Sequence, residues 1–561
     1  MKNVNKIKKY TVVFAVLLVA TLVLLSSQSV KNRNFEVAKN LDIFSSIVKE
    51  LELFYVDTID IDKTVKTGID KMFSSLDPYN EYYPEEKTSE FEQLLKGSFG
   101  GIGSLISYDS EIKRTVIKEP FENTPSSKAG LKAGDVIIKV DGVETKDKTS
   151  DKVTEMLKGK VGTSFVLEIE RPNAEGGMTP MTFNITRETI QHPLVPYSAI
   201  IDDKGVGYIS LTSFTGTPSK EFKKAFLELK RQGAKSLIID LRNNGGGLMH
   251  EAVNIVNFFT PKDKVVLTTK GKIKLAESVY KTISLPLDLE IPIVVLINGA
   301  SASASEIVSG ALQDYDRAVI MGSKSYGKGL VQTTRRLPYG ANMKITTAKY
   351  YIPSGRCVQS VEYKNKDENG NVTQTPDSLA KVFYTEGGRK VLDKGGITPD
   401  VKIEQEKIPN ILINLIIKNV IFNYGTQYAL KHDKVAEPDK FELTDKEYDE
   451  FKAYVKNTNF TYDLQSEKML NALRDIAKLE GYMDNSEKEF NALAEKLKHN
   501  MDKDLDYFKK DIKRAIELEI IVRYYFQKGG IKLNLKTDNE VLEAVSLLND
   551  AEKYKSILTK Q

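Results

Sequence analysis

One stretch, residues 293–332, constrains the fold of this chain more than any other. It opens with an uninterrupted apolar run, Ile293–Ile297, followed by Asn298-Gly299 and by a run of small residues at 300–306. β-Branched residues that end in an Asn-Gly pair predict a buried strand and a turn. Apolar residues at helical spacing then recur over 307–312. The stretch therefore predicts a strand, a tight turn and a helix whose first backbone amides point outward.

Two motifs within this stretch resemble those of the carboxy-terminal processing proteases, which are serine peptidases that use a Ser–Lys dyad. The first is Ser-Ala-Ser-Ala-Ser-Glu at 301–306, and the second is Tyr-Gly-Lys-Gly-Leu-Val-Gln at 326–332. The resemblance implies that Ser303 is the nucleophile and that Lys328, 25 positions later, is its base. It also implies that Gln332 orients this pair.

Such a dyad requires a neutral lysine. A serine hydroxyl is a poor nucleophile until a neighbouring base takes its proton. An unperturbed lysine has a pKa of about 10.4 and stays charged, whereas burial lowers its pKa by up to about 3–5 units. Gly327 and Gly329 flank Lys328 and give the backbone the freedom to bring its side chain into a packed interior. Gln332 can hold the amine by a hydrogen bond without adding charge.

A second glycine-rich run predicts another part of the site. The apolar run Leu237–Arg242 predicts a buried strand, and Asn243–Gly247 follows as a loop before a helix over 248–259. Strands alternating with helices predict a parallel sheet with sites at the carboxyl ends of its strands. The family resemblance implies a crotonase-like, spirally wound α/β core. It also implies an oxyanion hole made by the amide of Ala304 and that of Gly245 or Gly246, each worth about 3 kcal/mol of barrier.

Residues 91–188 resemble a PDZ domain in the circularly shifted order of bacterial proteases. The glycine-rich loop at 97–103 lacks the Gly-Lys-[Ser/Thr] ending of a phosphate loop, and a strand follows it instead of a helix. PDZ domains bind extended peptides by adding a strand to a sheet edge, and backbone amides hold the peptide carboxylate. By resemblance, these amides belong to Ile102, Gly103 and Ser104.

The N-terminus predicts export. Four lysines within the first nine residues precede an uncharged apolar run, Thr11–Leu25, which is the pattern of an export signal. Basic residues stay on the cytoplasmic side of a membrane. Ser27-Gln28-Ser29 matches a small-x-small cleavage site poorly. We expect a single-pass anchor in the inner (cytoplasmic) membrane with the catalytic part on the periplasmic side. The alternative is a soluble periplasmic protein after signal cleavage.

Composition and residue types exclude several other classes. The 81 basic and 77 acidic residues leave a net charge of only +4, so nucleic acid is not an expected partner. Cys357 is the only cysteine and cannot form an intramolecular disulfide. No His, Cys or Asp cluster has metal-ligand spacing, so we expect neither a metal nor a cofactor. His250 suggests a Ser–His–Asp triad, but no triad motif accompanies it and we interpret it as a surface helix residue.

The chain therefore divides into five predicted regions. They are a signal or anchor segment at 1–27, an N-terminal helical region at 28–90, a PDZ domain at 91–188, a Ser–Lys peptidase core at 189–400 and a C-terminal helical extension at 401–561. The helical region resembles the family's subunit-pairing segment, which implies a homodimer. We favour a stabilising cap for the extension over a partner-binding domain.

Two functions from different classes fit these patterns. The first is a serine endopeptidase that cleaves exported proteins near their carboxyl termini and recognises the substrate carboxylate through its PDZ domain. The second is a catalytically idle PDZ scaffold that binds protein tails at the membrane. The presence of Ser303, Lys328 and Gln332 together favours the enzyme.

Overall fold

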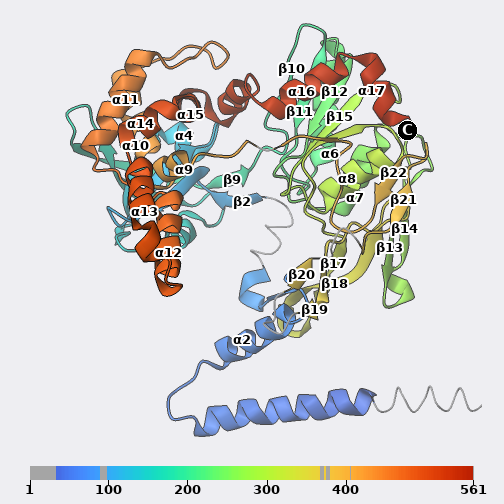
Figure 1. Ribbon diagram of the computed structural model, residues 1–561. Coiled ribbons are helices and arrows are strands. Elements are labelled where there is room, and N and C mark those ends of the chain that lie inside the picture. Colours follow the sequence, from blue (N-terminus) through green and yellow to red (C-terminus); the bar gives the residue numbers. More distant parts are fainter. Residues whose placement is uncertain (1–32, 89–97, 367–371, 375–378, 405, 560–561) are drawn as a thin grey trace, which may run out of the picture. The chain divides into compact units, whose positions relative to one another are not determined.

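The computed structural model describes residues 33–88, 98–366, 372–374, 379–404 and 406–559 (Figure 1). These residues form two units. The smaller unit comprises Met1–Glu86 and Gln332–Thr346, and the larger unit comprises Lys87–Val331 and Thr347–Gln561. The predicted anchor segment lies outside the described residues. Within them, no helix is long and apolar enough to cross a membrane.

The smaller unit begins with a long helix over 33–54, followed by α2 (Ile61–Ser74), β1 (Glu81–Tyr83) and the turn η1 (Glu85–Lys87). Asp60 caps α2 because its side chain accepts a hydrogen bond from the Lys63 amide at 3.0 Å. β1 pairs antiparallel with the first part of β18 (Asn342–Tyr351). The apolar stripe of the first helix stays exposed, so it is not a core face within the described residues.

The PDZ region of the larger unit forms a sheet in the order β3-β4-β5-β7-β8, with β6 paired to β5. Its strands are β3 (Ser104–Asp109), β4 (Arg114–Pro120), β5 (Val136–Val140), β6 (Val143–Glu144), β7 (Ser164–Pro172) and β8 (Met178–Thr186), and its helices are α4 (Pro125–Ala129) and α5 (Ser150–Leu157). β3 lies at one edge, paired only with β4 among the described strands. Part of the predicted glycine-rich loop is a strand, β2 (Ser98–Gly101), which pairs with β9 (Glu188–Gln191).

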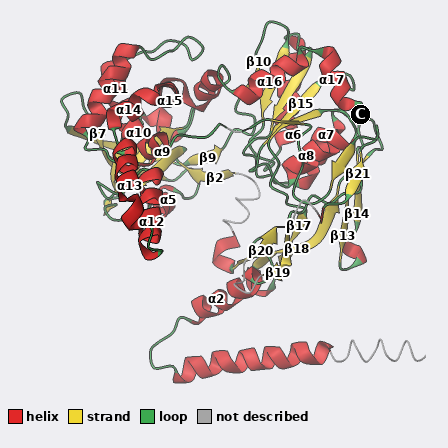
Figure 2. Cartoon of the chain, viewed as in Figure 1, coloured by secondary structure: helices red, strands yellow, loops and turns green. Residues whose placement is uncertain are grey.

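The peptidase region is built on a six-stranded sheet in the order β10-β11-β12-β15-β16-β23. Its strands are β10 (Ser198–Ile200), β11 (Val206–Ser210), β12 (Ser236–Asp240), β15 (Ile293–Ile297), β16 (Val319–Gly322) and β23 (Val401–Lys402). All neighbours pair in parallel except β10 and β11. The expected α/β class with a parallel sheet is therefore confirmed, and Figure 2 shows helices on both sides of the sheet.

Side chains alternate between the two faces of this sheet and bury a different core on each side. On one face, Ile239 and Val295 pack with α6 (Pro218–Arg231), α7 (Met249–Asn257) and α8 (Ala304–Asp314). On the other face, Ile238 and Val294 pack with α16 (Asn539–Leu548) and α17 (Ala551–Leu558). The uninterrupted apolar runs in the sequence arise because these strands are buried on both faces.

Further strands extend the peptidase region. They are β13 (Val265–Gly271), β14 (Ser278–Lys281), β17 (Leu330–Arg336), β19 (Val361–Lys366), β20 (Val372–Gln374), β21 (Val382–Tyr384) and β22 (Lys390–Leu392), with short turns η2 (Lys274–Ala276) and η3 (Pro338–Gly340). β13 pairs with β14 and with the second part of β18. β19 and β20 pair antiparallel with each other.

β23 belongs to the peptidase sheet although the predicted core ends at residue 400, and beyond it the C-terminal extension is helical, as expected. Its first helices are α9 (Asn410–Ile417), α10 (Val420–Lys431), α11 (Asp445–Asn457), α12 (Gln465–Leu479), α13 (Met483–Leu497), α14 (Met501–Tyr507) and α15 (Lys509–Asn534), and α16 and α17 follow. α15 is interrupted at Phe526, where φ is 54° and ψ is −169°. Residues before this break pack against α10, and residues near Ile531 and Leu535 pack against the peptidase sheet. One helix therefore spans two packing environments.

Candidate active site

Ser303 stands between the end of β15 and the start of α8, as the sequence predicts. Its backbone has φ 55° and ψ −110°, a conformation that non-glycine residues rarely adopt. Such a residue costs about 1–3 kcal/mol and persists only where its surroundings hold it in place. The side chain is only partly buried, whereas Ala302 and Ala304 are buried on either side. This strained junction presents a serine hydroxyl at a helix N-terminus.

The two flanking serines have their hydroxyls committed to the backbone. Ser301 Oγ donates to the carbonyl of Leu241 at 2.8 Å, and Ser305 Oγ donates to the carbonyl of Asn244 at 2.8 Å. Both residues are fully buried. Ser301 and Ser305 therefore fasten the loop after β12 to the turn that bears Ser303. Of the three serines in the motif, Ser303 is the one that is only partly buried.

Glu306, in the first turn of α8, joins the Ser303 turn to the segment that bears Lys328. Its Oε2 accepts hydrogen bonds from the amides of Ser303 at 2.8 Å and Lys328 at 2.9 Å. Its Oε1 accepts from Ser325 Oγ at 2.6 Å and from the Gly327 amide at 2.7 Å. The carboxyl is fully buried, and this burial raises its pKa. The four hydrogen bonds that this one side chain accepts fix the relative position of the two backbones.

The glycines around Lys328 have steric roles. Gly327 has φ 87°, and a Cβ there would lie 2.5 Å from Ser360 Cβ. A Cβ at Gly329 would lie 2.8 Å from the Gln359 amide nitrogen. The Gly329 amide donates to Gln359 Oε1 at 2.7 Å, and its carbonyl accepts from the Tyr350 amide at 3.0 Å. The backbone on both sides of Lys328 is therefore packed too closely for a Cβ atom at 327 or 329. The Lys328 side chain is partly buried.

Tyr350 approaches the site from β18. Its hydroxyl donates to the carbonyl of Ser303 at 3.3 Å, and the ring is fully buried. Burial, together with the charge of Glu306, raises the pKa of Tyr350 well above its usual value. The phenol therefore stays protonated and remains a donor to the Ser303 backbone.

The loop after β12 lies against Ser303. A Cβ at Gly246 would lie 2.9 Å from both Ser303 Cβ and the Ala304 amide nitrogen, so only glycine fits. The Gly246 amide donates to Asn244 Oδ1 at 2.9 Å, and Asn244 Nδ2 donates to the Leu211 carbonyl at 2.8 Å. The Gly245 amide has no hydrogen-bond partner among the described residues, and Gly245 is exposed. Of the two expected donors, Gly245 is the one left open.

The PDZ loop presents a similar arrangement of open amides. The carbonyl of Ile102 accepts from the Ser126 amide at 2.9 Å and from Ser126 Oγ at 2.6 Å. The carbonyl of Gly103 accepts from the Phe121 amide at 2.8 Å. No acceptor among the described residues takes the amides of Ile102 or Gly103. The Ile102 carbonyl and the Gly103 amide belong to one peptide plane and point in opposite directions. Anchoring that carbonyl therefore leaves the Gly103 amide open to an external anion.

Comparisons with known proteins identify the domains of the chain. Models of peptidase family S41, a PDZ domain and a "Probable PDZ-protease, C-terminal helical domain" match residues 205–366, 116–171 and 411–548. A carboxy-terminal-processing protease from Bartonella bacilliformis is 34% identical over 355 residues, which cover 62% of this chain and 79% of the relative. A "Probable CtpA-like serine protease" from Staphylococcus aureus is 36% identical over 351 residues, covering 62% of this chain and 68% of the relative.

This chain belongs to the carboxy-terminal processing protease family. It is accordingly a serine-type peptidase with a PDZ domain. Among solved structures, a photosystem II D1 C-terminal processing protease is 27% identical with a TM-score of 0.35, over 64% of this chain and 87% of that chain.

Gln332 lies in the smaller unit. Its side-chain amide donates to Thr346 Oγ1 at 3.1 Å, and Thr346 Oγ1 in turn donates to Asp77 Oδ1 at 3.2 Å. The role of Gln332 beside Lys328, inferred from the carboxy-terminal processing proteases, stays a prediction. His250 lies in the first turn of α7 and its side chain is 64% exposed, which agrees with a surface residue.

The sequence analysis does not predict the contribution of three residues to the site of this carboxy-terminal processing protease. They are Glu306, Asn244 and Tyr350. Glu306 had a readable signal, because Ser303-x-x-Glu306 is the spacing of a helix capping box. Asn244 and Tyr350 had none, since their hydrogen bonds join segments that are distant in the chain.

Proposed function

We propose that this carboxy-terminal processing protease is an endopeptidase that uses Ser303 as nucleophile and Lys328 as general base, and that recognises the free carboxyl terminus of its substrates. The observation that supports it most is the bridge made by Glu306 between the backbones of Ser303 and Lys328. The committed hydroxyls of Ser301 and Ser305 support the choice of Ser303.

In this mechanism, Ser303 Oγ attacks the scissile carbonyl carbon while the neutral Lys328 amine takes its proton. The resulting oxyanion sits between the amides of Ala304 and Gly245. Collapse of the tetrahedral intermediate breaks the C–N bond, and the lysine returns the proton to the leaving amine. Water, deprotonated by the same lysine, then attacks the acyl-enzyme ester and frees Ser303. Each bond formed to the carbonyl is balanced by one broken, and no redox step occurs.

Substrate recognition is assigned to the PDZ region. An extended peptide would add a strand beside β3, which has an unpaired edge among the described strands. Its terminal carboxylate would accept hydrogen bonds from the amides of Ile102, Gly103 and Ser104. The first two of these have no acceptor within the described residues, which supports the assignment. The substrates are exported proteins with accessible, extended carboxyl termini.

A fluorophosphonate probe tests the nucleophile. Wild-type protein should become labelled, and peptide mapping should find the adduct on the tryptic peptide that contains Ser303. Ser303→Ala protein should remain unlabelled while still binding a C-terminal peptide. A folded wild-type protein that binds tails but takes no label would instead support the idle scaffold.

We also infer that the chain is anchored in the cytoplasmic membrane with its peptidase region on the periplasmic side. The uncharged run Thr11–Leu25 after four lysines supports this. The protein should fractionate with membranes, resist extraction by high salt and be digested by protease added to spheroplasts. A mature N-terminus near residue 28 would show cleavage and a soluble periplasmic enzyme instead.

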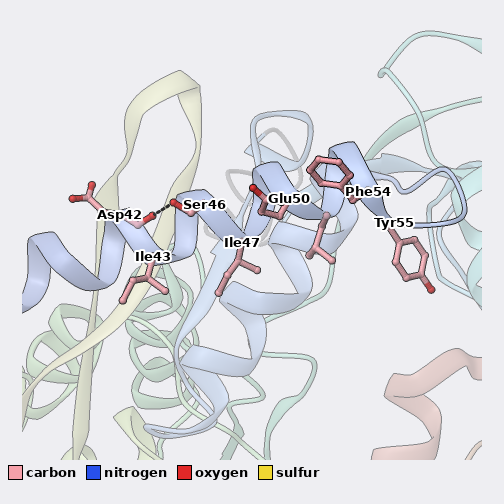
Figure 3. A pocket seen from close by; sticks show the side chains of 8 residues that line it. Asp42, Ile43, Ser46, Ile47, Glu50, Phe54 and Tyr55 are labelled. Carbon is pink, nitrogen blue, oxygen red and sulfur yellow. Dashed lines mark hydrogen bonds between the residues drawn. The ribbon is translucent and has the colours of Figure 1, made fainter.

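A homodimer is proposed from the first helix of the smaller unit. One side of it forms an open apolar groove that includes Ile43, Ile47 and Phe54 (Figure 3), and Phe54 is 74% exposed. An exposed apolar stripe of this kind marks an interaction surface. Sedimentation equilibrium should give twice the chain mass for the wild type, and Ile47→Asp with Phe54→Asp should reduce it. A monomeric wild type at micromolar concentration would contradict the dimer.

A further inference from the structure

A largely buried arginine lies between β12 and the candidate oxyanion loop. Arg242 is the second residue after the end of β12 at Asp240 and comes just before Asn243 and Asn244. Its guanidinium donates to both oxygens of Asp240, and the shortest of these contacts is 2.6 Å. Asp240 Oδ2 also accepts from the Tyr208 hydroxyl at 2.7 Å. These contacts come from the peptidase region itself.

The remaining acceptors for Arg242 come from the C-terminal extension. Asp538 receives two parallel hydrogen bonds from the guanidinium, at 3.0 and 2.8 Å, and Glu540 receives one at 2.5 Å. Bidentate arginine–carboxylate pairs are the most geometrically specific ionic contacts in proteins. The side chains of Arg242, Asp538 and Glu540 are only 15%, 19% and 14% exposed. Asp538 also caps α16, because it accepts from the Val541 amide.

Packing holds these two acids in place. Val541, Ala544 and Leu547 of α16 are buried against the peptidase sheet. The Tyr554 hydroxyl of α17 accepts from the Ile293 amide and donates to the Ile293 carbonyl, both at 2.9 Å. α16 and α17 are thus packed against the second face of the sheet. This packing holds Asp538, the N-cap of α16, and Glu540, within α16, beside Arg242.

The loop that follows Arg242 begins at the next residue and is itself hydrogen-bonded. The Asn243 amide donates to Asn298 Oδ1 at 3.0 Å, the Asn244 amide donates to the Leu241 carbonyl at 3.2 Å, and the Gly246 amide donates to Asn244. The loop backbone continues directly from Arg242. A shift of the backbone at Arg242 would therefore displace the donors of these hydrogen bonds. Loss of one partner would leave a buried guanidinium with an unsatisfied donor, which is far more costly than loss of an exposed pair.

We propose that Asp538 and Glu540 are positioning residues for the peptidase reaction: through Arg242 they hold the loop 243–247 so that its amide faces the oxyanion at Ser303. The C-terminal extension is in this view a component of the active site and not only a cap. The proposal rests on the proposed function for its catalytic consequence. Its structural part, the order of the loop, can be measured without any activity.

The test uses full-length protein and two variants, Asp538→Asn and Glu540→Gln. In Asp538→Asn, an amide NH₂ faces a guanidinium donor where a carboxylate oxygen accepted it, because both oxygens of Asp538 accept from Arg242. In Glu540→Gln, the amide oxygen can keep the single hydrogen bond, so this variant removes the charge. We expect kcat to fall about tenfold, with KM changed less than about twofold, because one charge-assisted hydrogen bond is lost at a site used in the transition state. Hydrogen exchange of the bonded loop amides, those of Asn243, Asn244 and Gly246, should become about tenfold faster. Glu540→Asp keeps the charge and should retain most of the activity.

Asp439→Asn is the matched control. Asp439 belongs to the same extension and pairs with Lys532 at 2.7 Å, but it does not touch Arg242. Asp439→Asn should change neither kcat nor the hydrogen exchange of the loop amides. Exchange of β15 amides, measured in the same experiment, shows whether each variant keeps its folded core.

Three outcomes are distinguishable. Unchanged kcat and unchanged loop exchange in both variants would overturn the proposal. Faster loop exchange in a chain whose wild type neither cleaves peptides nor takes a serine probe would support the positioning role and refute the proposed function. A uniform rise in exchange across β15 as well as the loop would assign the two acids to general stability, and would also overturn the positioning role.

Discussion

The carboxylate of Glu306 accepts a hydrogen bond from the backbone amide of Lys328 through Oε2, the oxygen that also accepts from the Ser303 amide. The donor and acceptor atoms lie 2.9 and 2.8 Å apart in the two bonds. A buried carboxylate that accepts from both segments sets their spacing before any substrate arrives. Such preorganisation is what nucleophilic catalysis by a serine and a lysine needs.

Glu306→Gln should therefore impair catalysis. Glutamine offers one acceptor oxygen where the carboxylate has two, and its NH₂ group would face backbone N–H donors. We expect kcat to fall at least about tenfold, because buried donors are left unsatisfied. Steady-state peptidase kinetics measure this. Glu251→Gln is the comparison, since Glu251 is also a buried carboxylate that accepts a backbone amide, from Ser219 at 2.8 Å. Equal activity loss in both variants would argue against a specific role.

Substitution of either dyad member should remove nearly all activity. Ser303→Ala and Lys328→Ala should each lower kcat by several orders of magnitude, and the double variant should be little worse because the pair acts as a unit. Lys328→Arg should also be inactive, since a guanidinium keeps its proton. Single-turnover assays with a fluorogenic peptide measure the residual rates. Wild-type turnover in Lys328→Ala would rule out the lysine base.

Ser301→Ala and Ser305→Ala should give a different result. Each removes a hydroxyl that holds the loop after β12, so kcat should fall by about tenfold or less while fluorophosphonate labelling persists. The unfolding midpoint should fall as well, because a buried carbonyl loses its donor. Complete loss of labelling in a folded Ser301→Ala or Ser305→Ala protein would move the nucleophile from Ser303.

Binding of a substrate tail should depend on a free carboxylate. Full-length Ser303→Ala protein should bind a peptide with an apolar C-terminus in the micromolar range or weaker, and amidation of that terminus should weaken binding. Amidation removes the charge that the amides of Ile102 and Gly103 would hold. Isothermal titration calorimetry with the matched acid and amide peptides compares the two. Equal affinities would leave the loop without its assigned role.

Stability should depend on pH through Lys118, in β4 of the PDZ region. Its ammonium lies 3.4 Å from the centre of the Phe422 ring and donates to Asn419 Oδ1 at 2.7 Å, both in the extension. Burial lowers its pKa from 10.5 to about 8 in the folded protein. Between these two values the unfolded chain binds more protons than the folded one, so the free energy of unfolding should rise as pH rises from about 8 to 10.5.

Lys118→Met removes the titrating group and serves as the comparison. Denaturant midpoints of the wild type and the variant should diverge over this pH range, with the wild type gaining stability relative to the variant. Parallel pH profiles would show that Lys118 keeps an ordinary pKa.

Local periodicity sufficed for much of the fold. β15 begins and ends at the residues that its apolar pattern predicts, because burial of this strand follows its own sequence. The glycine-rich run at 97–103 predicts a loop, but part of it forms β2. Glycines carry no information about the partner strand β9, which comes nearly ninety residues later. Asp538 and Glu540 come 296 and 298 residues after Arg242 in the sequence. Local sequence periodicity cannot predict contacts over such separations. Tertiary contacts of this kind decide the polar details of the site.

The order of the chain has a consequence for biosynthesis. The sheet that bears Ser303 is covered on its second face by α16 and α17, and Tyr554 bonds to Ile293 across 261 residues. During synthesis this face stays open until α16 and α17 have emerged from the ribosome. The second core of the sheet is therefore completed only after the PDZ region and the rest of the peptidase region have been made.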